Sequence, residues 1–185
     1  MKYGEYFGKY SNNCRIILNF AIHFYIIGMK IVLAVVGRMN SSYLNKGVDD
    51  YVARLRHYVP FEIVHIDDAK HTRNLTQDQQ KQAEGRNILA FLDRGDHVVL
   101  LDERGKMMRS VEFASYIERK MTTVQRRLVF VVGGPYGFSP EVYARADGQL
   151  SLSLMTLSHE MIRLVFTEQL YRAMTILRNE PYHHE

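Results

Sequence analysis

From Lys30 onward, short runs of aliphatic and β-branched residues alternate with stretches of helical period, and this alternation constrains the fold more than any other feature. Five runs are expected to be strands: residues 31–36, 61–66, 97–101, 128–132 and 150–154. Most of them are too uniformly apolar for a sheet with one face in water, where apolar and polar residues would alternate. The pattern predicts an α/β fold in which a mostly parallel sheet carries helices on both faces.

The stretches between these runs carry helix signals. Residues 44–58 have apolar side chains at three- and four-residue spacing, and residues 76–92 are polar first and apolar towards their end. Ser110 can cap a helix with an apolar stripe, and the sequence Ser-Pro-Glu at residues 139–141 supplies a cap, a first-turn proline and an acid. A last helix is expected over about residues 158–178, because Pro181 prevents its continuation.

The chain has 185 residues, enough for one sizeable core, and no repeat or linker divides it after Met29. We therefore expect a single domain over residues 29–185. Residues 1–28 differ in composition and end in an apolar run that Asn19 and His23 interrupt. The run is shorter than the roughly 20 apolar residues that a membrane span needs. A signal peptide is the alternative, since basic residues precede an apolar segment of suitable length, but no small-residue cleavage site precedes Met29. Residues 1–28 are thus expected to be an extension outside the fold, with no membrane anchor.

Cysteine content and charge restrict the partners. A single cysteine, Cys14, excludes an internal disulfide framework, offers no metal cluster and favours the reducing cytoplasm. Lys and Arg number 24 against 20 Asp and Glu, a mild excess that permits a nucleic-acid partner without demonstrating one. The plausible phosphate contacts are basic side chains that, taken singly, are more often solvated surface charges: Arg38, Lys46, Arg54, Arg104, Lys106 and Arg109.

The strongest local motif is VGGPYGFSP, residues 132–140, which follows an apolar run and precedes a helix cap. Its glycines let the backbone approach a ligand closely, and the N–H groups at the following helix start form a polar cradle. An ordinary tight turn is the alternative. The motif does not match G-x-G-x-x-G, and the chain has no G-K-[ST] phosphate loop, which disfavours nicotinamide and nucleoside triphosphate ligands.

Two further segments carry candidate chemistry. LLDERGK, residues 100–106, lies at the carboxyl end of the third predicted strand, where open α/β sheets bind their ligands. LSLSLMTLSHEMIR, residues 150–163, runs from a strand through a bend rich in serine and threonine into the last helix. Taken singly, the two segments are better explained as a solvated turn and a plain strand-to-helix connection.

Together these segments resemble the SPOUT methyltransferase superfamily and, within it, the family of ribosomal RNA large subunit methyltransferase H, over residues 29–185. LDERGK, VGGPYGFSP, SLSLMTLSHEMIR, EQLYRAMTI and NEPYHHE occur in the order and spacing of that family. The resemblance implies a deep trefoil knot in the C-terminal part, an exception to the rule that chains avoid threading. It also implies a homodimer that uses S-adenosylmethionine to methylate ring nitrogen 3 of pseudouridine 1915 in the 23S rRNA of the assembled ribosome.

The resemblance implies that the cofactor is held mainly by backbone groups, and no metal is expected. The implied cofactor-binding residues are Leu101, Gly133, Leu152, Ser153, Leu154, Met155, Thr156 and Leu157. Adenine has a flat apolar face with hydrogen-bonding edges, which suits leucine side chains and main-chain amides. This interpretation requires Leu101, Gly133 and Met155 to line one hollow.

Pseudouridine nitrogen 3 carries a weakly acidic proton, so a nearby base or an anion-stabilising cation would promote methyl transfer. Four side chains are candidates for a catalytic role: His159, Arg163, Tyr182 and His183. His159 and Arg163 lie four residues apart and are expected to share a helix face, as base and anion stabiliser. The alternatives are a locally hydrogen-bonded His159 and an Arg163 that pairs with a carboxylate or a phosphate.

Tyr182 and His183 belong to a short aromatic and basic tail that suits stacking on an unpaired base. A frayed terminus is the alternative. Members of the family often carry an arginine after Tyr-His, whereas this chain has His184 there, which weakens a phosphate role for the position.

Two rival functions are compatible with the sequence. The first is a non-catalytic ribosome- or RNA-binding module that keeps the fold, and the second is an unrelated α/β enzyme that acts on a nucleotide or another RNA site. The intact VGGPYGFSP and SLSLMTL segments argue against a decayed cofactor site. Affinity for S-adenosylmethionine separates the first rival from the enzyme.

Overall fold

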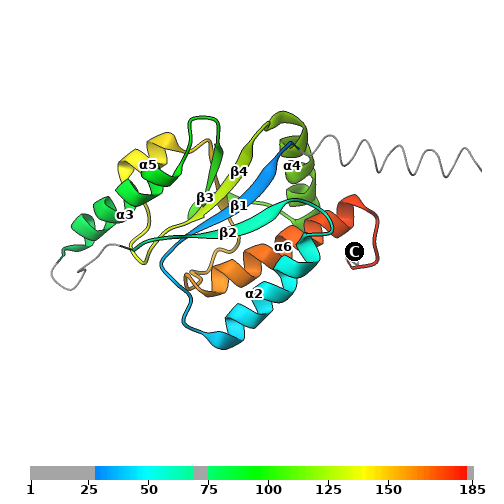
Figure 1. Cartoon of the computed structure of the whole chain (residues 1–185), viewed down its shortest axis with the longest axis horizontal. Coiled ribbons are helices and arrows are strands. Elements are labelled where there is room, and N and C mark those ends of the chain that lie inside the picture. The colour runs from blue at the N-terminus through cyan, green and yellow to red at the C-terminus, as the bar shows by residue number, and fades with distance from the viewer. Residues whose placement is uncertain (1–27, 69–74, 183–185) are drawn as a thin grey trace, which may run out of the picture.

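The computed structural model describes residues 28–68 and 75–182, whose strands form one five-stranded sheet (Figure 1). The strands are β1 (Lys30–Val36), β2 (Phe61–Ile66), β3 (His97–Met107), β4 (Arg127–Val132) and β5 (Gly148–Ser151). They lie in the order β2-β1-β4-β3-β5, and every neighbouring pair is parallel. The predicted α/β fold with a parallel sheet is confirmed.

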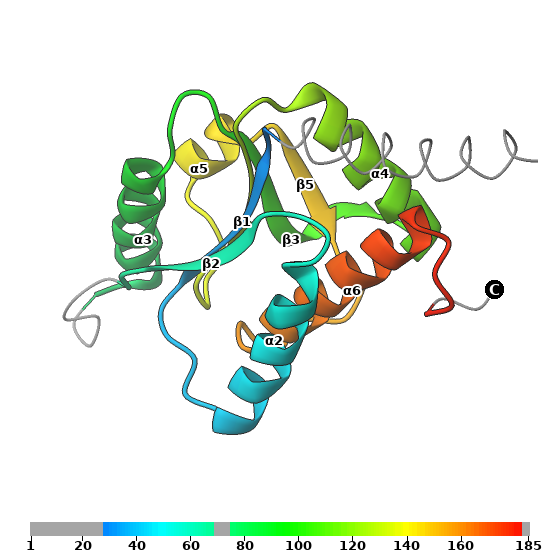
Figure 2. The ribbon, with the colours of Figure 1, turned by 45° about the vertical axis from the view of Figure 1, so that its right-hand side comes forward.

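Helices cover both faces of the sheet, as predicted (Figure 2). One face carries α2 (Ser42–Leu55), α4 (Ser110–Thr123) and α6 (Met161–Leu177), and the other carries α3 (Gln77–Phe91) and α5 (Pro140–Arg145). Successive residues of β1 point to opposite faces, because side chains alternate along a strand. Ile31, Leu33 and Val35 join the first core, whereas Val32, Ala34 and Val36 join the second. Both faces are apolar because both are buried.

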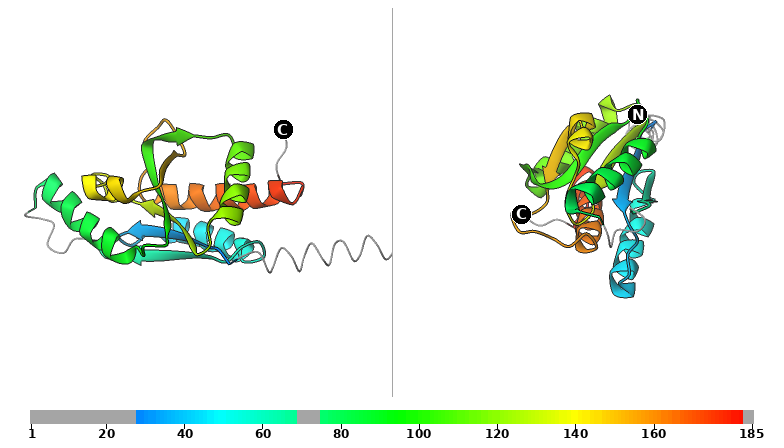
Figure 3. Two further views of the ribbon diagram at one scale, coloured as in Figure 1. Left: turned by 90° about the horizontal axis from the view of Figure 1, so that it is seen from above. Right: turned by 90° about the vertical axis from the view of Figure 1, so that its left-hand side faces the viewer.

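The long helix α6 lies across one face of the sheet, between α2 and α4 (Figure 3). Phe166 is fully buried in α6, and its ring centroid lies 4.7 Å from that of Phe130 in β4 and 6.4 Å from that of Phe113 in α4. This aromatic cluster fixes the helix against the sheet. It thereby places the N-terminal end of α6 beside the carboxyl ends of β1 and β4.

Two strand boundaries differ from the predictions. The prediction that the last strand reaches Leu154 is wrong, since β5 ends at Ser151. β5 is an edge strand, and the Ser151 hydroxyl donates to the Ser153 carbonyl oxygen at 2.8 Å, which bends the chain away from the sheet. The third strand does not end at Leu101 but continues to Met107 beside β5, after a shift in register between Leu101 and Lys106.

The helix ends also refine the expectations. Thr76 caps α3 through a reciprocal pair of hydrogen bonds with Gln79. The prediction that Ser110 caps α4 is wrong, because Arg109 occupies the cap position and the Ser110 hydroxyl donates to the Gln169 side chain of α6. Ser139 does lie at the cap position of α5, although its side chain makes no capping bond.

The last helix begins at Met161, three residues after Ser158, whose hydroxyl accepts a hydrogen bond from the Met161 N–H at 3.2 Å. It ends at Leu177, and the chain then reverses at Asn179, which has a φ of 54°. The predicted extension, apart from Gly28, lies outside the described residues, as does His183. In residues 28–68 and 75–182, no helix combines the length and apolarity that a membrane span needs.

Candidate functional site

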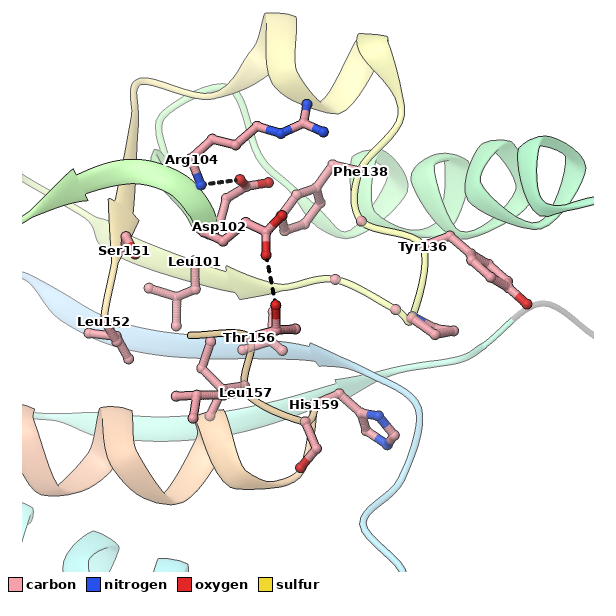
Figure 4. A pocket seen from close by; sticks show the side chains of 18 of the residues that line it. Leu101, Asp102, Arg104, Tyr136, Phe138, Ser151, Leu152, Thr156, Leu157 and His159 are labelled. Carbon is pink, nitrogen blue, oxygen red and sulfur yellow. Dashed lines mark hydrogen bonds between the residues drawn. The ribbon is translucent and has the colours of Figure 1, made fainter. Parts of the chain in front are cut away.

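Three segments that are distant in sequence meet in one cavity of about 650 Å³ beside the middle of β3 and the carboxyl ends of β4 and β5 (Figure 4). They are residues 101–104, residues 132–138 and the bend between β5 and α6. Leu101, Gly133 and Met155 therefore line one hollow, as the sequence interpretation requires. This edge of a parallel sheet is where ligands bind in α/β folds.

The turn after β4 forms one wall of the cavity. The Gly137 N–H donates to the carbonyl oxygen of Gly134 at 3.2 Å, which closes a tight turn around Pro135 and Tyr136. Gly137 has a φ of +78°, a left-handed value that L side chains rarely adopt. Gly133, Gly134 and Gly137 all line the cavity and, having no side chains, offer it only main-chain groups.

Two acidic residues of β3 tie the walls of the cavity together. Asp102 accepts hydrogen bonds from the Tyr143 hydroxyl at 2.5 Å and from the Arg104 N–H at 2.8 Å. Glu103 accepts a hydrogen bond from the Thr156 hydroxyl at 3.1 Å, which joins β3 to the bend before α6. Burial, together with the hydrogen bond to Asp102, raises the pKa of Tyr143 to about 12. Tyr143 therefore stays a neutral donor at physiological pH.

The bend between β5 and α6 forms the opposite wall. Ser153 Oγ accepts a hydrogen bond from the Met155 N–H at 2.9 Å, so a hydroxyl group satisfies a main-chain donor that no strand pairs. The predicted cofactor residues that line the cavity here are Leu152, Ser153, Met155, Thr156 and Leu157. Leu154 is 84% exposed and is not part of the lining.

His159 lines the cavity at the end where the bend approaches α6 (Figure 4). Arg163 does not line it, because its side chain is buried beneath the bend and only 1% exposed. Its guanidinium donates to the carbonyl oxygens of His159 at 3.0 Å and of Val36 and Gly37 at 3.1 Å each. No acidic group of the described residues forms an ion pair with Arg163, and its Nη1 has no hydrogen-bond partner among them. Burial lowers the pKa of this guanidinium, while Glu160 opposes the shift.

Tyr182 does not line the cavity. Its hydroxyl is 3.2 Å from the Tyr51 hydroxyl and donates to Glu168 at 3.2 Å, and its ring packs edge-on against Tyr171 at 4.9 Å between centroids. Burial raises the pKa of Tyr182, and the hydrogen bond to Tyr51 adds to the shift. The tail is therefore anchored on α2 and α6 as far as Tyr182.

Several lining residues had no assigned role in the sequence interpretation. Asp102 and Glu103 lie in the LLDERGK segment, where an acidic pair directly after a buried run was the available signal. Tyr143 offered no signal, since its contact with Asp102 joins positions 41 residues apart. Two of the predicted phosphate contacts lie at hollows: Arg104 lines the cavity, and Arg38 lines a smaller hollow of about 280 Å³ at the ends of β1 and β2. In the part of the chain that the structure covers, no three His, Cys, Asp or Glu side chains are grouped to hold a metal.

Comparison with known protein families matches residues 29–183 to a family described as predicted SPOUT methyltransferase. Among curated proteins, ribosomal RNA large subunit methyltransferase H of Parabacteroides distasonis is 57% identical over 157 residues, which are 85% of this chain and the whole of that protein. The protein of the same name from Phocaeicola vulgatus gives the same identity and the same coverage.

A solved structure, a probable rRNA-methyltransferase from Porphyromonas gingivalis, superposes with a TM-score of 0.45 at 12% identity. The superposition covers 81% of this chain and 70% of the other. The sequence matches, which are far stronger, carry the family assignment.

Proposed function

The chain belongs to the SPOUT methyltransferase family and, within it, to the family of ribosomal RNA large subunit methyltransferase H, and from this premise we propose that it uses S-adenosylmethionine to methylate nitrogen 3 of a pseudouridine in 23S rRNA. It is an RNA methyltransferase. We propose further that it acts in the cytoplasm on the assembled ribosome, as a homodimer with a trefoil knot around the cofactor. The observation that carries the proposal is the single cavity that Leu101, Gly133 and Met155 share.

The residues around the cavity suit this cofactor. A volume of about 650 Å³ falls within the range of about 300–1,000 Å³ that is usual for small-molecule sites. Leu101, Leu152 and Leu157 offer apolar contacts for adenine, and Asp102 and Glu103 supply negative charge for a positively charged ligand. When bound, S-adenosylmethionine supplies a methyl group that its sulfonium already activates. The protein has then to align the nucleophile and remove its proton.

We assign proton removal to His159, because it is exposed and lines the cavity. Loss of the proton from nitrogen 3 leaves a negative charge on the pseudouridine ring. The positive charge of Arg163 lies directly behind the main chain of His159 and stabilises this anion through its field, without touching the base. Its bonds to Val36, Gly37 and His159 also fix the end of β1 against the bend.

The position of Tyr182 supports the proposed homodimer. The contact partner Tyr171 lies ten residues into α6 from Met161, about 15 Å along the helix axis. Tyr182 packs on Tyr171 and so does not reach the cavity of its own subunit. A catalytic role for Tyr182 therefore requires the cavity of a second subunit, and we propose the same for His183, the next residue in the chain. Exposed apolar side chains near the cavity, Leu154 at 84% and Met155 at 76%, suit a contact with that subunit.

The deciding experiment is mass spectrometry of 23S rRNA from a strain that lacks the protein. We expect the loss of one methyl group at a pseudouridine, restored by the wild-type chain and not by His159→Ala. Restoration by His159→Ala would refute the assignment of the base, and an unchanged methylation pattern would refute the proposed substrate. The rival non-catalytic module is tested by calorimetry, where absence of S-adenosylmethionine binding to the wild type would favour it.

Mixed dimers test the role of the tail. His159→Ala and His183→Ala subunits should each be inactive alone. Mixing them should restore about a quarter of wild-type activity, since half of randomly formed dimers are mixed and each mixed dimer holds one intact cavity. No restoration would contradict the exchange of tails between subunits.

A further inference from the structure

The carboxyl group of Glu84 is buried behind the turn that borders the cavity. Glu84 lies in α3 and is only 2% exposed. Its Oε1 accepts a hydrogen bond from Gln80 Nε2 at 2.8 Å, whereas Oε2 has no partner among the described residues. A buried acceptor without a partner is unfavourable, so its presence beside a ligand cavity calls for a physical reason.

Glu84 lies in direct contact with Gly134, the first glycine of the turn. The three atoms nearest to a β-carbon added at Gly134 would all belong to Glu84, at 2.2 Å for Oε2, 2.7 Å for Cδ and 2.9 Å for Oε1. The next residue, Gly85, packs closely against Ser139, which follows the turn, because a β-carbon added at Gly85 would lie 2.5 Å from Ser139 Oγ. Glu84 and Gly85 thus set the distance between α3 and the chain from Gly134 to Ser139.

The surroundings of this carboxyl favour its uncharged form. Burial raises the pKa of Glu84, and the negative charge of Asp68 after β2 raises it further, while the hydrogen bond from Gln80 opposes the shift. Gly134 contacts the carboxyl without contributing a charge. The uncharged acid can donate a hydrogen bond through its hydroxyl, whereas the carboxylate can only accept.

We propose that Glu84 is a positioning residue of the methyltransferase, whose buried carboxyl group supports the Gly134–Gly137 turn from behind and so fixes one wall of the cofactor cavity. This inference rests on the proposed function. Because the folded protein favours the uncharged form, the carboxyl supports the turn fully below its ordinary pKa of 4.5. This support is lost as the pH rises through the raised pKa of Glu84. Ionisation would place a buried charge, with no positively charged partner among the described residues, against the turn.

The first test compares wild type with Glu84→Gln, which keeps the shape of the side chain and is uncharged at every pH. Calorimetry would measure the Kd for S-adenosylmethionine over about pH 5 to about pH 9, the range in which buried glutamates titrate. We expect the wild-type Kd to rise about tenfold more than that of Glu84→Gln, a difference of about 1.4 kcal/mol. Parallel pH profiles would overturn the proposal. Titration of the cofactor itself changes the Kd of both proteins equally, so it does not contribute to the difference between them.

The second test is a double-mutant cycle with the contact residue. Gly134→Ala alone should weaken cofactor binding and lower the Tm, because the added methyl group meets the Glu84 carboxyl. Combining Gly134→Ala with Glu84→Ala removes the obstruction and should recover part of the loss that Gly134→Ala causes. Strictly additive effects would refute direct support of the turn.

A readout without cofactor separates this inference from the proposed function. The amide resonances of Gly134 and Gly137 should shift with pH in wild type and stay unchanged in Glu84→Gln. If wild type fails to bind S-adenosylmethionine at every pH, the proposed function fails, while the amide shifts still test the role of Glu84.

Discussion

Replacing Gly137 by alanine isolates the backbone cost of the turn that walls the cavity. The φ of Gly137 is +78°, and a β-carbon added there would meet no atom within 4 Å, so the substitution introduces strain without a clash. An L residue in this conformation is disfavoured by about 1–2 kcal/mol. If the turn keeps its shape, the free energy of unfolding should fall by this amount, which corresponds to about 2–8 °C in Tm for a chain of this size. If the turn relaxes instead, stability is kept and the Kd for S-adenosylmethionine should rise about 5- to 30-fold.

Gly148→Ala is the matched control for this experiment. Gly148 also has open space around its missing β-carbon, but its φ lies outside the left-handed region. Alanine there should leave stability unchanged or raise it by up to about 1 kcal/mol, through the lower entropy of the unfolded chain. Thermal unfolding and calorimetry on both variants measure the two quantities together. If Gly137→Ala matches Gly148→Ala in both, the left-handed turn does not constrain the cavity.

Replacing Arg163 by methionine should lower the single-turnover methylation rate roughly 10²-fold at an unchanged cofactor Kd, whereas Arg163→Lys should keep part of the rate because it keeps the charge. A raised cofactor Kd with an unchanged rate at saturating cofactor would contradict the role assigned to this charge. Burial lowers the pKa of His97, and Lys120 adds to the shift. The neutral imidazole therefore contributes to the free energy of unfolding above the ordinary pKa of 6.5, and this contribution is lost as the pH falls through the lowered pKa. His97→Gln should therefore flatten the acid side of the stability profile in urea titrations, and an equally steep profile would exclude His97 as the cause. Phe166→Ala should lower the free energy of unfolding by about 3–5 kcal/mol, because a fully buried ring is removed from the aromatic cluster, and a loss below about 1 kcal/mol in urea would contradict that packing.

The layers of the fold could be predicted from the sequence because they depend on local patterns. Strands buried on both faces are apolar throughout, and β1 shows this directly, since its alternate residues enter two separate cores. The start of α3 was also predictable, because Thr76 and Gln79 bond to each other within four residues.

The boundaries that were predicted wrongly depend on partners elsewhere in the chain. Residues 150–154 have the alternation of a strand, but strand pairing stops at Ser151. β5 lies at the sheet edge, and the Ser151 hydroxyl bonds to the Ser153 carbonyl oxygen and turns the chain. Ser110 has the residue type of a cap, yet Gln169 of α6, 59 positions away, takes its hydroxyl.

Part of the candidate site could likewise be predicted from local sequence, and part depends on residues far apart in the chain. The residue types of the three turns, and their place after apolar runs, could be recognised along the chain, and the structure joins Leu101, Gly133 and Met155 in one cavity. The burial of Arg163 could not be recognised, since the carbonyl groups that hold it belong to residues up to 127 positions away. The contact between Glu84 and Gly134 likewise exists only once α3 packs behind β4.

By itself, the amino-acid sequence determined the periodicity of the elements, the two-sided burial of the sheet and the glycines that make a tight turn possible. Only the tertiary structure decided which atoms face the cavity, which charges lie in the core and which helices hold the tail as far as Tyr182. The physical reason is range: backbone conformation and side-chain periodicity act over a few residues, whereas burial and ion pairing depend on groups that come together after the chain folds.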